Sequence, residues 1–374
     1  MGNGQKRNEI CFCGSGKKFK RCCINKNVNI SFKFVHASQQ SPEPNLGIVP
    51  SLEFQGQRVR TIWSTLYFRP LRETFHEFLI LMAYRNTYGK EFHENQVSIP
   101  SDKRHVTFKW WEAYCEWGFK NINNIVEIEN GKVYYGTSTG EIQSLLQHAY
   151  DLFCLQIVNR LPEFFISKLR DVHEFQGVKY EVAVAAIMAR AGFEIEFLDD
   201  NYKSEVHCEF IATHKESGQK IGVEAKSKRR KGVLHEEGEF NADADNRGNI
   251  QHLFRKARTQ KPKDIPFLIF IDMNLPSTNV NNNSFDGEPP DKTWEHDIDQ
   301  IYANYKNQST SPDPFNAVYF TNFAFYYQGN NSLSFPWITY IKKSESPEHE
   351  IRENSLLECI QSSIMRYSDI PQEI

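Results

Sequence analysis

The stretch that most constrains the fold of this 374-residue chain is residues 206–228, which predicts a β-hairpin. Val206–Thr213 forms the expected first strand and Gln219–Lys226 the second. Between them, Lys215–Gly218 contains Ser and Gly, which favour tight turns. Apolar and polar side chains alternate along the second strand, so that its two faces differ in character. A hairpin of this kind determines which residues of its two strands lie opposite one another.

Two glutamates are predicted to face each other across this hairpin. If the turn is centred between Glu216 and Ser217, Glu209 lies opposite Glu224, with Cβ atoms about 5 Å apart. Like charges placed opposite each other are destabilising, so such a pair needs a cation between the carboxylates or a shared proton. Lys226 emerges on the same face as Glu224.

Two carboxylates and a lysine on one face form a site suited to phosphate chemistry. Carboxylate oxygens suit Mg²⁺, which keeps coordination positions for water and a substrate phosphate. The lysine can hold or deprotonate the attacking water, or offset charge on the phosphate. The alternative interpretation is an exposed hairpin that carries scattered charge, which is common on strands.

The flanking residues predict the rest of a mixed α/β core. Apolar side chains recur at helical spacing over residues 180–191, and Gly192 ends that helix. Phe193–Phe197 alternates as a strand. After the hairpin, residues 248–259 predict a helix, and the apolar run Phe267–Ile271 predicts a buried strand. The expected order is therefore helix, three strands, helix, strand.

This order and its acidic residues resemble the PD-(D/E)XK nuclease superfamily over residues 174–274. Glu224-Ala225-Lys226 matches the family's E-x-K element, Glu209 takes the place of the preceding acid, and Glu181 matches a helix-borne glutamate. The first acid, usually Asp in the family, is Glu here. The resemblance implies a restriction-endonuclease-like αβββαβ core of the α/β (α+β) class. It implies that Glu181, Glu209, Glu224 and Lys226 are catalytic residues. It also implies that Glu209 and Glu224 hold Mg²⁺ or Mn²⁺.

Four cysteines near the N-terminus predict a structural metal site. Cys11 and Cys13 are separated by a Gly-Ser-Gly turn from Cys22 and Cys23, a spacing that suits tetrahedral Zn²⁺. So short a segment has almost no core and needs metal to fold. The pattern C-x-C-G-S-G-K-K-x-K-x-C-C resembles the SEC-C motif, a zinc module also found in the preprotein translocase ATPase. Its basic surface can grip phosphates or an acidic protein, and related modules dock on proteins or ribosomes.

A basic run follows the E-x-K element and predicts contact with a phosphate backbone. It consists of Lys228, Arg229, Arg230 and Lys231. The alternative is a solvated strand end. The net charge of −3 excludes a chain that is basic throughout, so any nucleic-acid surface must be local.

The remaining sequence indicates how the chain is divided into domains but contains no further candidate site residues. We expect a zinc module at 1–26, a mostly helical region of unassigned role at 27–165 and a nuclease-like domain with a C-terminal sheet extension at 166–374. Within the middle region, Arg60–Tyr88 predicts a helix broken near Pro70, and the aromatic-rich Phe108–Phe119 predicts a core helix. No apolar run reaches membrane-spanning length and no signal peptide is recognisable, so we expect a cytoplasmic protein with reduced cysteines.

The sequence thus favours a metal-dependent nuclease that acts on DNA and is recruited through its zinc module; the resemblance makes bacterial antiviral defence a plausible setting. One alternative is a nuclease-like fold without activity that binds nucleic acid or protein. Another is an adaptor whose zinc module docks on a ribosome or chaperone. The choice between these hypotheses depends on whether the predicted site residues converge.

The zinc prediction can be tested on the purified protein. We expect metal analysis to give close to one Zn²⁺ per chain, and the double variant Cys22→Ser/Cys23→Ser to lose it because two of the four thiolate ligands are gone. The double variant Cys154→Ser/Cys359→Ser is the matched control and should keep its zinc. Zinc-free wild-type protein with an ordered N-terminal segment would contradict the prediction.

Overall fold

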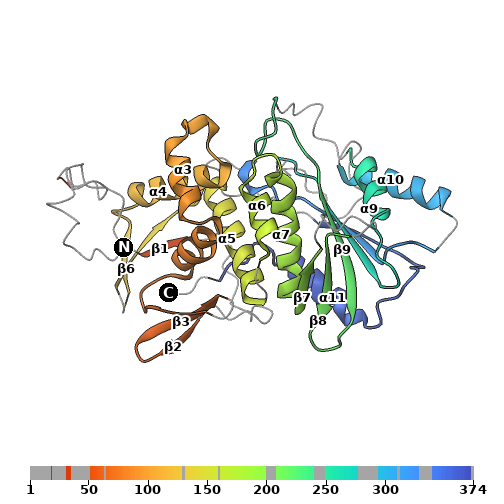
Figure 1. Ribbon diagram of the computed structural model, residues 1–374, viewed down its shortest axis with the longest axis horizontal. Helices are drawn as coiled ribbons and strands as arrows, with labels where there is room; N and C mark the ends of the chain where they lie inside the picture. Colours follow the sequence, from red (N-terminus) through yellow and green to blue (C-terminus); the bar gives the residue numbers. More distant parts are fainter. Residues whose placement is uncertain are drawn as a thin grey trace.

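A six-stranded mixed sheet is the central element of the fold (Figure 1). The computed structural model describes residues 18, 31–34, 51–62, 65–128, 131–158, 161–198, 208–239, 249–276, 294–309, 312–327 and 339–371. In chain order the strands of this sheet are β7 (Phe193–Phe197), β8 (Phe210–His214), β9 (Lys220–Ser227), β10 (Phe267–Asp272), β11 (Ala317–Thr321) and β12 (Thr339–Lys343).

The sheet has the spatial order β12-β11-β10-β9-β8-β7. Strands β7, β8 and β9 form an antiparallel meander, β10 and β11 run parallel to β9, and β12 closes the sheet antiparallel to β11. This confirms the predicted mixed α/β (α+β) class. It also confirms that the C-terminal strands extend the sheet.

Helices cover both faces of the sheet. Helix α7 (Phe175–Arg190) and helix α11 (Asn354–Met365) lie on one face, and helix α9 (Gln251–Arg258) and helix α10 (Trp294–Gln308) lie on the other. The two faces have separate hydrophobic clusters, one containing Ala225 and the other containing Ile269. The chain therefore contains the predicted order of helix, three strands, helix, strand as α7-β7-β8-β9-α9-β10.

The β8–β9 hairpin has the predicted register. Phe210 pairs with Val223 and Thr213 pairs with Lys220, which centres the turn where the sequence places it. Strand β8 begins later than predicted, at Phe210, and Glu209 lies just before it. The Glu209 amide donates to the Val223 carbonyl at 3.1 Å, so Glu209 and Phe210 both lie against one residue of β9. Two residues opposite one is the arrangement of a β-bulge, which redirects side chains locally.

The middle region is built around helix α5 (Gly140–Val158), which is almost wholly buried. Shorter helices surround it: α1 (Phe75–Phe78), the π-helix Leu79–Tyr84, α2 (Arg85–Tyr88), α3 (Lys90–Ser98), α4 (Val106–Lys120) and α6 (Glu163–Arg170). Helix α4 contains the predicted aromatic core residues, among which Trp110 and Trp117 are buried.

Two small sheets also belong to this region, so it is less helical than predicted. One has the order β1 (Ser31–Phe34), β6 (Gly131–Gly136), β5 (Ile125–Ile128), and the other is β2 (Leu52–Phe54), β3 (Gln57–Ile62), β4 (Thr65–Pro70).

The predicted helix over Arg60–Pro70 is therefore wrong. Arg58 and Arg60 alternate into the interior of β3, and Arg60 forms a buried ion pair with Glu73 at 3.2 Å. Strands are recognised in a sequence by apolar side chains at every second position. In β3 the inward-facing residues at these positions are arginines, so the strand has no such apolar pattern. The helix of this stretch begins only at Phe75, capped by Thr74.

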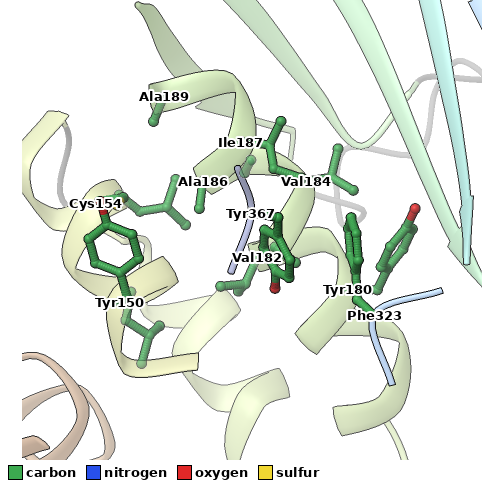
Figure 2. Close-up of a cluster of buried hydrophobic side chains, with 14 of the residues drawn as sticks. Tyr150, Cys154, Tyr180, Val182, Val184, Ala186, Ile187, Ala189, Phe323 and Tyr367 are labelled. Atoms are coloured by element: carbon green, nitrogen blue, oxygen red, sulfur yellow. The ribbon is translucent and has the colours of Figure 1, made fainter. Parts of the chain in front are cut away.

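Helices α5 and α7 join the middle region to the sheet. Figure 2 shows Tyr150 and Cys154 of α5 beside α7, with Tyr180 of α7 close to Phe323. The Phe323 ring stacks on Tyr367, with ring centroids 4.0 Å apart. One continuous hydrophobic cluster thus includes residues from both sides of the predicted boundary at 165–166. The division into domains stays a prediction.

The packing of β9 can be tested at Gly222. A Cβ atom there would lie 2.4 Å from Cγ of Pro262, a rigid ring in the segment that follows α9. We expect Gly222→Ala to lower the free energy of unfolding by about 1–3 kcal/mol because backbone must shift to relieve the overlap. Gly177→Ala is the matched control. It lies in α7 with no atom within 4 Å, and should be neutral or stabilising by up to about 1 kcal/mol. Equal unfolding curves for the two variants would contradict this packing.

Candidate functional site

Strand β9 presents the E-x-K element to the face of the sheet that α9 covers. Glu224 pairs with Ile269 of β10, and Lys226 pairs with Ile271. Both isoleucines belong to the hydrophobic cluster that contains Phe254 of α9. Since directly paired residues of neighbouring strands point to the same side, Glu224 and Lys226 also point to that face.

The three predicted residues of the hairpin converge at the carboxyl end of β9. The Lys226 ammonium lies 2.5 Å from Oε1 of Glu209 and 2.5 Å from Oε1 of Glu224. The ion pairs are sheltered, since the side chains of Glu224, Glu209 and Lys226 are 1 %, 19 % and 20 % exposed. The sequence argument required a cation between two facing carboxylates, and in this structure that cation is the lysine itself.

Glu224 is the most buried of these three residues. Both of its carboxylate oxygens are buried, and their closest partner is the Lys226 ammonium, 2.5 Å from Oε1. Burial raises the pKa of Glu224, and the charge of Lys226 opposes that rise while the charge of Glu209 adds to it. A buried carboxylate is costly unless a cation or a proton accompanies it, and at Glu224 the Lys226 ammonium fills that role.

Glu181 lies on helix α7, which covers the other face of the sheet, and its charge interacts with those of the site residues. Burial raises its pKa, the nearby charges of Glu209 and Glu224 raise it further, and Lys226 and Lys168 oppose the rise. The pKa of Lys226 changes in the same direction for a different reason. Burial lowers it, but the charges of Glu224 and Glu209 outweigh that effect and leave it raised. The protonation states of these residues are therefore linked to one another.

These residues fit a hard divalent cation in donor chemistry. Glu209 and Glu224 offer carboxylate oxygens of the kind that Mg²⁺ and Mn²⁺ prefer. In the described part of the chain, no group of three or more His, Cys, Asp or Glu side chains is already gathered in metal-binding geometry. A metal ion would therefore have to compete with the Lys226 ammonium for the two carboxylates.

The basic run after β9, residues 228–231, contains two residues that bond to the protein backbone and two that are exposed. Arg230 is buried, and its Nε and Nη2 atoms donate to the Met273 carbonyl at 3.3 and 3.0 Å. Lys228 donates from Nζ to the Asn249 carbonyl at 3.1 Å. Arg229 and Lys231 are exposed. Arg230 is thus held inside the protein in this structure, and the predicted phosphate contact of all four residues stays a prediction.

The segment that follows this run is fixed to the middle region. His235 accepts a hydrogen bond at Nε2 from the Val106 amide, at the start of α4, at 2.9 Å. Gln176 of α7 donates to the Val233 carbonyl at 3.3 Å. Leu234 and His235 both adopt positive φ, which is uncommon for residues other than glycine. The middle region thus positions the backbone next to the site.

Sequence reasoning missed a second polar cluster at the same end of the sheet, on the α7 face. Asp272, at the carboxyl end of β10, accepts hydrogen bonds from the Ser227 hydroxyl at 3.2 Å and the Phe323 amide at 3.3 Å. Burial raises the pKa of Asp272, and the charge of Lys179 opposes the rise. The available signal was an acid directly after the apolar run Phe267–Ile271, at a strand end where side chains gather.

The predicted zinc ligands Cys11, Cys13, Cys22 and Cys23 lie outside the described residues. Among the described cysteines, those at positions 115, 154, 208 and 359 are free thiols. The helices in the described ranges include none that is long and apolar enough to cross a membrane.

Comparison with known proteins identifies one short match. A family model described as the SEC-C motif matches residues 7–25, which include the four N-terminal cysteines. No curated protein and no solved structure matches the chain. The SEC-C resemblance read from the cysteine spacing is thereby confirmed for that segment.

The raised pKa values of Glu181 and Glu224 predict a pH dependence. The folded, metal-free protein keeps these protons at a pH where unfolded glutamates have lost them. Their contribution to stability is therefore full below the ordinary glutamate pKa and declines as the pH rises above about 5. We expect Glu224→Gln to flatten this decline in chelator-treated protein, and the exposed control Glu216→Gln to leave it unchanged. Urea unfolding at several pH values measures it, and a wild-type slope in Glu224→Gln would contradict the assignment.

Proposed function

We propose that this protein is a metal-dependent nuclease that hydrolyses phosphodiester bonds in DNA. The observation that carries the proposal is the convergence of Glu209, Glu224 and Lys226 at the carboxyl end of β9. The order α7-β7-β8-β9-α9-β10 supports it, because it is the αβββαβ order of the PD-(D/E)XK core that the sequence resembles.

Each residue of the site has a role in this proposal. Glu209 and Glu224 would hold Mg²⁺ or Mn²⁺, with Glu181 as a further acid, directly or through water. The metal would supply Lewis acidity toward the phosphate and lower the pKa of a bound water. Lys226 would give up its contacts with the carboxylates and hydrogen-bond the attacking water or a phosphate oxygen. There it would stabilise charge that develops as the water oxygen bonds to phosphorus and the P–O ester bond breaks.

The N-terminal module would serve recruitment rather than chemistry. Cys11, Cys13, Cys22 and Cys23 would hold one structural Zn²⁺ as thiolates, and the match to the SEC-C motif supports this assignment. We propose a protein or ribosomal partner for this module, which would bring the nuclease to its place of action. A setting in bacterial defence would suit a nuclease recruited in this way.

A specific observation favours a second candidate, a nuclease-like fold that binds nucleic acid or protein without cleaving it. Lys226 already contacts both carboxylates and offsets their charge without a metal. The first acid is also Glu209, one methylene longer than the Asp usual in the family that the chain resembles. In this alternative the ion pairs are permanent and stabilise the fold.

Cleavage and metal binding separate the two candidates. Plasmid DNA, single-stranded DNA and RNA are incubated with Mg²⁺ or Mn²⁺ and the wild type, Glu224→Gln, Lys226→Ala or the exposed control Glu216→Gln. We expect the wild type and control to cleave DNA, and each site variant to be slower by roughly 10²-fold or more. Mg²⁺ should raise the melting temperature of the wild type and Lys226→Ala but not of Glu224→Gln, which lacks a ligand carboxylate.

A different result would contradict the nuclease proposal. If Mg²⁺ stabilises Glu224→Gln as much as the wild type and no nucleic acid is cleaved, the site is not a catalytic metal site. The binding protein then becomes the better account.

A further inference from the structure

Helix α9 lies over the face of the sheet that presents the acid–lysine site. Its buried residues Phe254 and Ala257 share a hydrophobic cluster with Ile269, the β10 partner of Glu224. The strands β9 and β10 are parallel, so the helix that connects them must run antiparallel to both. The first turn of α9 therefore lies at the carboxyl end of β9, where the site is. The hydrogen bond from Lys228 Nζ to the Asn249 carbonyl, 3.1 Å long, joins these two ends.

The solvent face of α9 is basic and contains no acid. From Asn249 to Lys263 the sequence has no Asp or Glu and includes five cations: Arg255, Lys256, Arg258, Lys261 and Lys263. Two of these are committed to the protein, because Arg258 lies over the Tyr305 ring at 4.2 Å and Lys261 pairs with Glu348 at 2.5 Å.

Arg255 and Lys256 remain directed to solvent. Both are exposed, and within the described ranges neither forms an ion pair. The Nη2 atom of Arg255 lies 3.2 Å from Nδ1 of the exposed His252 on the same helix. Two adjacent cations on a segment whose own sequence contains no acid make a local positive surface on a protein whose net charge is −3.

We propose that α9 binds the sugar-phosphate backbone of duplex DNA through Arg255 and Lys256 and guides it to the Glu209–Glu224–Lys226 site. This rests on the proposed nuclease function and names the surface that holds its substrate. Eight residues of helix span about 12 Å, roughly three to four base steps along one strand. Among Phe, Tyr and Trp, α9 contains only Phe254, which is buried, so the helix offers charge but no large aromatic platform on which unpaired bases stack. Contact with the backbone alone suits a duplex, whose bases stay stacked.

Binding without cleavage tests the proposal. The anisotropy of a fluorescein-labelled DNA duplex is measured in EDTA over a series of salt concentrations with full-length protein. The variant is Arg255→Gln/Lys256→Gln. The matched control is Lys215→Gln/Lys220→Gln, which removes two exposed cations from the opposite end of the β8–β9 hairpin. A charge-preserving variant, Arg255→Lys/Lys256→Arg, reports rescue, and melting curves confirm that all variants are folded.

We expect the α9 variant to bind roughly tenfold more weakly and to show a salt slope shallower by roughly two, one for each lost phosphate contact. The control and the charge-preserving variant should bind as the wild type does. An unchanged salt slope in the α9 variant, an equal loss in the control, or wild-type protein that binds only an RNA duplex of the same sequence overturns the proposal.

The outcome is separate from that of the nuclease proposal. Cleavage is assayed in parallel with Mg²⁺ for the wild type and Glu224→Gln. Cleavage by wild type alone, together with wild-type affinity of the α9 variant, refutes the α9 surface and leaves the nuclease standing. Weakened binding by the α9 variant without cleavage by any protein supports the surface and refutes the nuclease.

Discussion

The ion pairs of Lys226 with Glu209 and Glu224 are the interaction on which the site depends. Glu224 lies on β9, between β8 and β10, where its side chain is removed from water. A carboxylate in such a place is costly unless a cation or a proton accompanies it. Lys226, two residues along the same strand, supplies the cation. Because one ammonium serves two acids, the geometry requires the hairpin register and the bulge that places Glu209.

The surroundings hold this arrangement from both sides. On the sheet side, Arg230 is fixed to the Met273 carbonyl at the end of β10. On the helical side, His235 accepts from the start of α4, and α7 brings Glu181 toward the same end of the sheet. The middle region thus shares a core with the sheet and frames the site. Precise support of this kind is what a site needs if its groups are to keep their positions when a substrate binds.

Sequence reasoning succeeded where local pattern and geometry agree. The turn residues and the alternation in 219–226 predicted the hairpin register correctly, although Glu209 lies against Val223 rather than directly opposite Glu224. Helix α7 followed from apolar side chains at helical spacing, and strand β10 followed from a continuous apolar run. The predicted helix over Arg60–Pro70 failed because the inward-facing Arg60 is buried through an ion pair with Glu73, 13 residues away, which no local pattern reveals.

The division of the basic residues was also beyond the sequence. Four consecutive cations after β9 look equivalent, yet Arg230 turns inward because the Met273 carbonyl lies within its reach. The basic face of α9 was overlooked for the opposite reason. Its cations are spread over a helix and become one surface only when the crossover places that helix beside the site. Both results depend on tertiary contacts between segments that are separate in sequence.

The central claim is that Glu209 and Glu224 form a cation site from which the Lys226 ammonium can be displaced. The most direct measurement is a crystal structure with Mn²⁺, whose anomalous scattering locates the ion. The account predicts an anomalous peak coordinated by both carboxylates, with Lys226 moved away from at least one of them. A structure at saturating Mn²⁺ with no peak there, and with Lys226 still bridging the two glutamates, would contradict it.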